Sequence, residues 1–249
     1  MSLTDCIDEY ESSDDISRKV PKGRRSSSLT KPIAKGDPTQ YSETIGESLE
    51  ERQALFEQLR KEYTDMICKE KPAIIFAQEE NEVTEGTTLE DFLQKHGPFP
   101  VEEHIAAGII RSVSSAIMFL HCREVVHGCL DFTSVVLDRY FNAKTIVSSA
   151  VYRVKSSKAA GARGKVEDVF HVGLLLYRLL TGHKAKFGQN GELLTKPSPY
   201  MRISEKGMKL VEFMFATNLR FPPTIGRVRY SDWLDECDEN PPVFVLFPS

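Results

Sequence analysis

Apolar residues recur every three or four positions in several stretches of this chain, which is the spacing of one face of an α-helix. The first stretch runs from Ser48 to Tyr63. Ser48 is followed three residues later by Glu51, the pattern of an N-terminal capping box. A short, mostly apolar run at 72–77 predicts a buried strand. The pattern therefore predicts a helix and then a strand.

Helical spacing returns from residue 86. A short helix is expected at 86–93, ended by Gly97-Pro98, and a long one at 101–120. The inward face of the long helix is expected to hold Ile105, Ile109, Val113, Ile117 and Leu120. Residues 125–138 then predict a turn and a strand.

Later stretches are also expected to be helical. Residues 169–180 are so apolar that they predict a largely buried central helix. Amphipathic patterns predict a further helix through 209–214 and a last one that includes 228–234. Strands are few in this part of the chain, so the sequence predicts an α+β protein in which helices dominate.

The first 45 residues differ from the rest because they are rich in Ser, Asp, Lys, Gly and Pro, with few large apolar side chains. Such a stretch cannot bury enough surface to offset its ordering entropy, so a disordered tail is expected. Within it, Arg24 and Arg25 precede Ser27 and Ser28, the pattern of a basic-directed phosphorylation site. A solvated basic patch explains the same residues equally well.

The overall composition excludes several classes of protein. The 249 residues are 41% hydrophobic and 27% charged, with a formal net charge of −4. This weakly acidic balance gives no reason to expect a nucleic acid or a membrane as partner. The five cysteines are scattered and never spaced as Cys-x-x-Cys, so neither a disulfide framework nor a zinc site is indicated. We expect a cytoplasmic or nuclear protein.

A polar motif follows the long helix. His127-Gly128-Cys129-Leu130 is followed by a short apolar strand that ends at Leu137-Asp138. This arrangement resembles the protein-kinase catalytic loop, His-Arg-Asp-Leu-x-x-x-Asn, and the strand after it.

Three further segments resemble other parts of the kinase family, in the same order. Residues 86–93 resemble the helix after the hinge, 167–182 the central buried helix, and 203–234 the closing helices. The resemblance implies a protein-kinase-like fold, with a mainly α-helical C-lobe and a truncated N-lobe. A narrower resemblance, over 89–127, is to the degenerate kinase domain of the general-control kinases of translation initiation factor eIF2-alpha.

The resemblance also implies the domain boundaries. We expect a disordered tail at 1–45, an N-lobe remnant at 46–86, a kinase-like C-lobe at 87–236 and a C-terminal tail at 237–249. The end of that last segment is apolar, so it either packs back on the lobe or presents a docking peptide.

Positions that carry phosphoryl-transfer chemistry in kinases hold other residues here. Cys129 stands where the family has its catalytic Asp, and Ser134 where it has a metal-binding Asn. The metal-binding Asp-Phe-Gly triplet aligns with Ser148-Ser149-Ala150, and no acidic residue occurs from 144 to 155. No glycine-rich loop is found in 1–86. Asp131 could supply the missing carboxylate, but a turn residue is the simpler interpretation.

Two residues match positions that, in the family, fasten the catalytic loop to the central helix. These are His127 and Asp168, which we expect to be structural anchors. Asp168 is also expected to be the N-cap of the central helix.

Together these replacements predict a catalytically inactive pseudokinase. It would be no enzyme, with neither cofactor nor metal, and would serve intracellular signalling as a protein-binding scaffold or regulator. Its partners would be other proteins, including active kinases or their substrates. One alternative is a divergent ATP-binding Ser/Thr protein kinase with unconventional metal handling. Another is a fragment or splice product of a larger kinase-like protein.

Overall fold

A computed structural model of the chain describes seven stretches of residues. They are 48–67, 72–77, 86–154, 158–188, 193–195, 203–216 and 221–239. The predicted tail at 1–45, with Ser27 and Ser28, lies outside the described residues, as does the apolar segment at 240–249.

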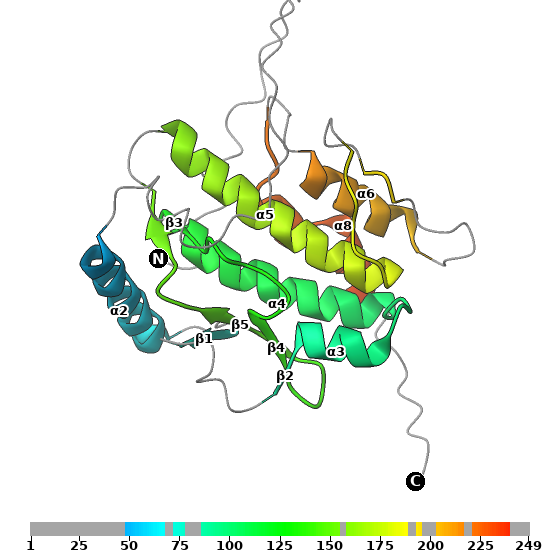
Figure 1. The fold of residues 1–249 in the computed structure, drawn as a ribbon, viewed down its shortest axis with the longest axis horizontal. Helices are drawn as coiled ribbons and strands as arrows, with labels where there is room; N and C mark the ends of the chain where they lie inside the picture. Colours follow the sequence, from blue (N-terminus) through cyan, green and yellow to red (C-terminus); the bar gives the residue numbers. More distant parts are fainter. Residues whose placement is uncertain are drawn as a thin grey trace, which may run out of the picture.

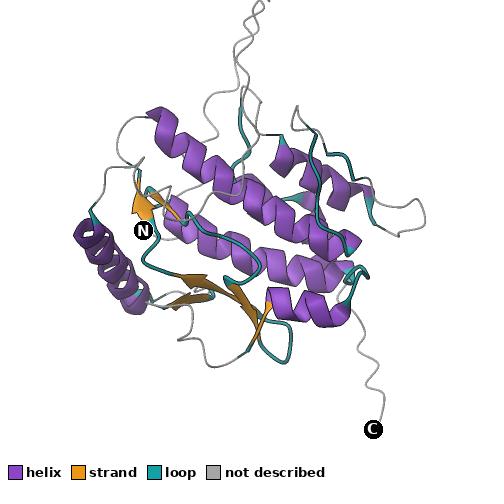
Figure 2. Cartoon of the chain, viewed as in Figure 1, coloured by secondary structure: helices purple, strands orange, loops and turns teal. Residues whose placement is uncertain are grey.

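The described chain is a mixed α+β structure, as the sequence predicts (Figure 2). Its helices are α2 (Leu49–Asp65), α3 (Leu89–His96), α4 (Glu103–His121), α5 (Lys158–Thr181), α6 (Glu205–Phe215), α7 (Ile225–Arg229) and α8 (Asp232–Glu239). Its strands are β1 (Ile74–Phe76), β2 (Thr87–Thr88), β3 (Val125–Val126), β4 (Val135–Leu137), β5 (Ala143–Val147) and β6 (Tyr152–Arg153).

The strands form two small sheets at one side of the helices (Figure 1). The larger sheet has the order β1-β5-β4-β2, in which β1 pairs with β5 in parallel and the other pairs are antiparallel. The smaller sheet pairs β3 with β6. Strands β3 and β4 flank the loop that holds the catalytic-loop-like motif, so the two sheets fix both ends of that loop.

Helix α4 is the centre of the core. Its side chains Ile109, Val113, Ile117 and Leu120 are fully buried, as predicted, whereas Ile105 is only partly buried. The helix lies beside α5 and also contacts α7, α8 and β5 (Figure 1). By length and composition α4 could cross a membrane, but 67% of its apolar stretch is buried inside the fold. Its hydrophobicity is therefore accounted for by the protein core.

Helix α2 begins where the capping box predicts. The Ser48 hydroxyl accepts a hydrogen bond from the backbone N–H of Glu51 (3.1 Å), and the Glu51 carboxylate accepts one from the backbone N–H of Ser48 (2.9 Å). The buried face of the helix carries Leu55, Phe56 and Leu59, which belong to the same core cluster as α4. Helix α2 and strand β1 thus share a core with α4.

Two helix boundaries differ from the sequence expectation. Helix α5 begins at Lys158, eleven residues before the apolar run at 169 that predicted it. The pattern missed this first part of the helix because it is less hydrophobic than the run that follows. Asp168 is consequently inside the helix, so its expected role as N-cap is wrong. The last predicted helix is two helices, α7 and α8, separated at Tyr230-Ser231. Thr224 caps α7 by accepting from the backbone N–H of Arg227.

The C-terminal end of α5 is fixed by a close backbone contact. Gly182 follows the helix with a φ of 71°, a conformation that favours glycine. A Cβ atom at this position would lie 2.3 Å from the carbonyl oxygen of Pro98. The N–H of Val101 also donates to the carbonyl of Leu179 (2.7 Å), so the entry to α4 is attached to the end of α5.

Alanine substitution should have opposite effects at Gly182 and at Gly108, a glycine without such a contact. Gly182→Ala should lower the free energy of unfolding by about 2 kcal/mol or more, because the added Cβ disfavours the left-handed backbone conformation and clashes with the Pro98 carbonyl. Gly108→Ala should raise it by roughly 0.5–1 kcal/mol, because Gly108 is an exposed position of α4 with no atom near the added Cβ. Urea denaturation measures both, and equal midpoints for the two variants would contradict the expectation.

Candidate functional site

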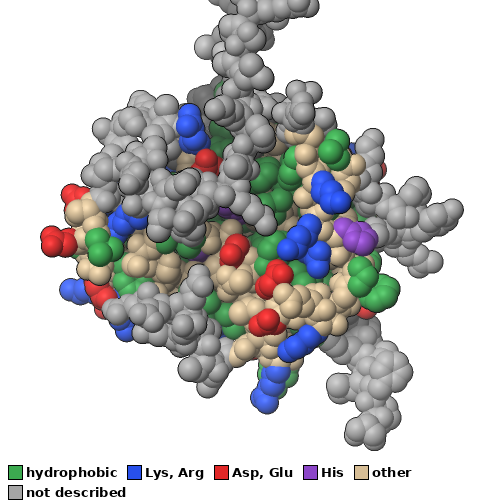
Figure 3. Space-filling model, viewed as in Figure 1, with side chains coloured by type: hydrophobic (Ala, Val, Ile, Leu, Met, Phe, Trp, Pro, Cys, Tyr) green, Lys and Arg blue, Asp and Glu red, His purple; other side chains and the backbone are tan. Residues whose placement is uncertain are grey.

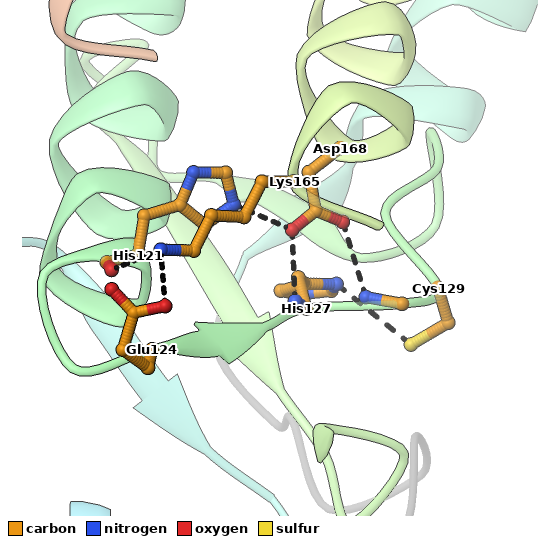
Figure 4. A network of polar contacts seen from close by, with 7 residues as sticks. His121, Glu124, His127, Cys129, Lys165 and Asp168 are labelled. Carbon is orange, nitrogen blue, oxygen red and sulfur yellow. Dashed lines mark hydrogen bonds and ion pairs between the residues drawn. The ribbon is translucent and has the colours of Figure 1, made fainter. Parts of the chain in front are cut away.

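The loop between β3 and β4 is attached to the middle of α5 through one carboxylate (Figure 4). Asp168 Oδ2 accepts a hydrogen bond from the backbone N–H of His127 (2.9 Å), and its Oδ1 accepts one from the N–H of Gly128 (3.1 Å). Two successive amides thus converge on one side chain, which holds the backbone just before Cys129.

A third group completes this anchor. His121, at the end of α4, places its Nε2 2.8 Å from Asp168 Oδ2. Asp168 is 1% exposed and His121 8% exposed. Burial by itself raises the pKa of the Asp168 carboxyl, but the hydrogen bond and charge of His121, with the His127 amide and charge, lower it below its usual value. Asp168 is therefore a buried anion with partners from two other segments.

His127 is fully buried and has an acceptor at each ring nitrogen. Its Nε2 lies 2.9 Å from the carbonyl oxygen of Ile146, and its Nδ1 lies 3.9 Å from the sulfur of Cys129. Burial lowers the pKa of the imidazole, but the Cys129 sulfur, the Asp168 charge and the Ile146 carbonyl outweigh it and raise the pKa to about 9. The ring is thus a cation at neutral pH, donating from both nitrogens.

Cys129 lies between this imidazole and the end of β5. Its sulfur is 3.7 Å from the hydroxyl oxygen of Ser148, which also accepts from the backbone N–H of Ala150 (3.3 Å). Ser149 and Ala150 form the turn that follows β5. The structure therefore brings together Cys129 and Ser148, the positions matched to the catalytic Asp and to the first residue of the Asp-Phe-Gly triplet.

Ser134 and Asp131 point instead into their own turn. Asp131 Oδ1 accepts from the backbone N–H of Thr133 (2.8 Å) and of Ser134 (2.9 Å), and from the hydroxyl of Thr133 (2.7 Å). The Ser134 hydroxyl donates to the carbonyl of Asp131 (2.9 Å) and accepts from its N–H (2.8 Å). Both side chains fix the shape of the loop, which agrees with the interpretation of Asp131 as a turn residue.

The magnesium-bound nucleotide that a kinase-like fold implies does not fit this donor set. Mg²⁺ prefers carboxylate oxygens. The turn after β5 offers hydroxyls and amides, and Oδ1 of Asp131 accepts hydrogen bonds from its own loop. Among the described residues, no group of three or more His, Cys, Asp and Glu side chains is placed to hold a metal.

Two parts of this network were not singled out from the sequence. His121 is one, because a histidine at the end of an apolar helix carries no spacing signal that links it to Asp168. Lys165 is the other, since its ammonium donates to the carbonyl of His121 (3.0 Å) and to the carboxylate of Glu124 (2.9 Å) (Figure 4). Lys165 lies one helical turn before Asp168, so α5 holds the end of α4 at two points.

The buried anchor predicts a large loss of stability for a small change. Asp168→Asn removes the charge that faces His121 and replaces one acceptor with a donor, so the free energy of unfolding should fall by about 3 kcal/mol or more. Glu167→Gln, at the neighbouring residue, is the control. Burial, and then the charge of Asp168, raise the pKa of the Glu167 carboxyl. That variant should stay within about 0.5 kcal/mol of the native chain. Matching thermal unfolding curves for the two variants would refute this role of Asp168.

The raised pKa of His127 predicts a pH dependence of stability. The folded chain binds this proton more tightly than the unfolded chain, whose histidine titrates near 6.5. The contribution is therefore complete below pH 6.5 and is lost as the pH rises through about 9. The free energy of unfolding should fall by on the order of 1 kcal/mol per pH unit between these values.

Replacing the sulfur tests the cause of this slope. Cys129→Ala should flatten the decline, because the sulfur is the largest influence that raises the His127 pKa. Cys122→Ala, at another partly buried cysteine, should keep the decline of the native chain. Chemical denaturation at a series of pH values measures this, and an unchanged slope in Cys129→Ala would disprove the link.

Two protein kinases show weak, partial similarity to this chain, and no family model matches it. The serine/threonine-protein kinase PrkC of Bacillus subtilis (strain 168) is 25% identical over 120 residues, covering 41% of this chain and 18% of that kinase. Calcium-dependent protein kinase 21 of Arabidopsis thaliana is 27% identical over 183 residues, covering 61% of this chain and 34% of that kinase. The chain thus spans about a third or less of the length of each relative.

These relatives correct one expectation. The sequence predicted that the chain is not an enzyme, because of the residues Cys129, Ser134 and Ser148–Ala150 and the missing glycine-rich loop. Both relatives are named as protein kinases, so the comparisons point toward a kinase-like enzyme family, and the prediction is wrong. The narrower resemblance to general-control kinases stays a prediction. What the comparisons support is a protein-kinase-like relationship for this chain.

Proposed function

We propose that the chain is a kinase-like domain that acts in intracellular signalling by binding other proteins as a scaffold or regulator. Its partners would be active kinases or their substrates, in the cytoplasm or the nucleus. The C-lobe arrangement expected for 87–236, with a reduced N-lobe before it, belongs to the same proposal. The observation that carries it is the anchoring of the loop at 127–134 by the buried carboxylate of Asp168.

This anchoring supports a binding role because it gives the loop a fixed shape. Asp168 holds the first amides of the loop, and Asp131 and Ser134 bond to the loop's own backbone. Surfaces that bind other proteins benefit from such preorganisation, since less entropy is lost when the partner docks. The side chains of Asp131 and Ser134 thus serve to hold the shape of the loop.

A second candidate is a divergent ATP-binding Ser/Thr protein kinase with unconventional metal handling. The names of the two relatives favour it. It requires the site around Cys129 and Ser148 to accommodate a nucleotide with a different set of ligands from the carboxylates that Mg²⁺ prefers.

Three measurements on the purified full chain separate the candidates. The first is incorporation of radioactive phosphate from ATP, with Mg²⁺ or Mn²⁺, into the chain and into a general basic substrate. The second is the shift in thermal unfolding on adding ATP with and without the metal, because a ligand that binds the folded state raises its stability. The third is recovery of cross-linked partners by the native chain and by Cys129→Ala.

The binding role predicts that the same partners are recovered without added nucleotide and by Cys129→Ala. The kinase candidate predicts metal-dependent phosphate incorporation that falls at least tenfold in Cys129→Ala. Partner recovery that requires ATP and disappears in this variant would overturn the binding role and favour the kinase.

A further inference from the structure

A pocket lies beside β4, the strand that directly follows the anchored loop. It has a volume of about 800 Å³ and is framed by the C-terminal half of α3, strand β2 and the β4–β5 hairpin. Figure 1 shows the hairpin and α3 next to each other at one edge of the molecule. Neither the Asp168 network nor Cys129 contributes to it.

Three cations line the pocket, one from α3 and two from the β4–β5 hairpin. Lys95 is on α3, Arg139 is in the hairpin turn and Lys144 is on β5, and all three side chains are exposed. None of them forms an ion pair with a carboxylate in the part of the chain that the structure describes. Figure 3 shows Lys and Arg side chains at this lower edge of the molecule.

The single carboxylate in the lining is already engaged. Asp138 accepts from the backbone N–H groups of Tyr140 (2.7 Å) and Asn142 (3.0 Å) and from the side-chain amide of Asn142 (2.8 Å). The side-chain amide of Asn142, then these backbone groups and the charge of Lys144, lower its pKa. Its oxygens therefore hold the hairpin turn, and the pocket presents an excess of positive charge to solvent.

Aromatic side chains form the rim of the pocket. Tyr140 is 67% exposed and Phe141 39% exposed. Phe141 has a φ of 64°, which is unfavourable for a bulky residue, and its ring lies edge-on to that of Phe92 at 5.5 Å. The Arg139 guanidinium carbon is 4.8 Å from the centre of the Tyr140 ring. The hairpin thus displays two large rings beside cations that form no ion pair with a carboxylate among the described residues.

We propose that this pocket binds an acidic peptide segment of a partner protein, one that carries a large aromatic or apolar side chain among its carboxylates. The charge of the pocket fits carboxylates, and its rings fit an aromatic side chain. The cations are distributed over α3 and two parts of the hairpin, its turn and β5, which suits an extended segment better than a single small anion. Three cations on a chain of net charge −4 are too few to favour nucleic acid. This inference rests on the proposed binding role and specifies its partner.

Fluorescence anisotropy of a labelled synthetic peptide with the purified full chain tests the proposal. The probe is a short peptide of glutamates around one phenylalanine, and a matched peptide has glutamine at every glutamate. The acidic peptide should bind, and the glutamine peptide should bind at least about tenfold more weakly. Added salt should lower the affinity of the acidic peptide.

Charge-removing variants show whether this pocket is responsible. The combined change Lys95→Gln, Arg139→Gln and Lys144→Gln should weaken binding at least about tenfold. Lys61→Gln, Arg163→Gln and Lys184→Gln remove three other exposed cations and should change it less than about twofold. Tyr140→Ala should weaken binding without changing charge, and its 67% exposure makes it compatible with folding.

Several results would overturn the proposal. These are absence of binding, equal binding of the glutamine peptide, and equal effects of the two triple variants. Full competition by inorganic phosphate would indicate a small-anion site. Binding that appears only after removal of residues 1–47 would indicate that the acidic start of the chain itself occupies the pocket. If cross-linked partners are still recovered when the peptide fails to bind, the docking site is refuted and the binding role stands.

Discussion

The buried carboxylate of Asp168 is the constraint on which the arrangement of the described chain depends. It joins the middle of α5, the end of α4 through His121 and the loop after β3 through two backbone amides. An anion with so little exposure is tolerated only when its partners are all in place. The longest helices and the catalytic-loop-like segment therefore cannot shift independently, and each relies on the other two for its position.

Much of the fold could be predicted where a local signal exists. The capping box at Ser48 and the Gly97 stop give helix ends to within a few residues, because these depend on neighbouring hydrogen bonds and on a positive φ. The early start of α5 could not be predicted, since its first residues lack an apolar stripe. The break between α7 and α8 was also missed, because a short amphipathic pattern continues across Tyr230-Ser231.

The candidate site was predictable in its positions but not in its contacts. The resemblance to kinases singled out His127, Cys129 and Asp168, and the structure places them in one network. His121 was missed because only the folded chain brings it to Asp168, 47 residues later in the sequence. The prediction that the chain is no enzyme was wrong for a different reason. The residue types at aligned positions do not by themselves establish which reactions a site can catalyse.

The parallel pairing of β1 with β5 has a consequence for the order in which the chain folds. Ile74 meets Thr145 about 70 residues later in the sequence, whereas β4 and β5 are joined by a short turn. Closing so long a loop carries an entropic cost that local pairs avoid, so the hairpin can form well before β1 joins it. On the ribosome, the apolar strand β1 emerges long before its partner exists. During that interval its unpaired edge is open to chaperones or to another chain.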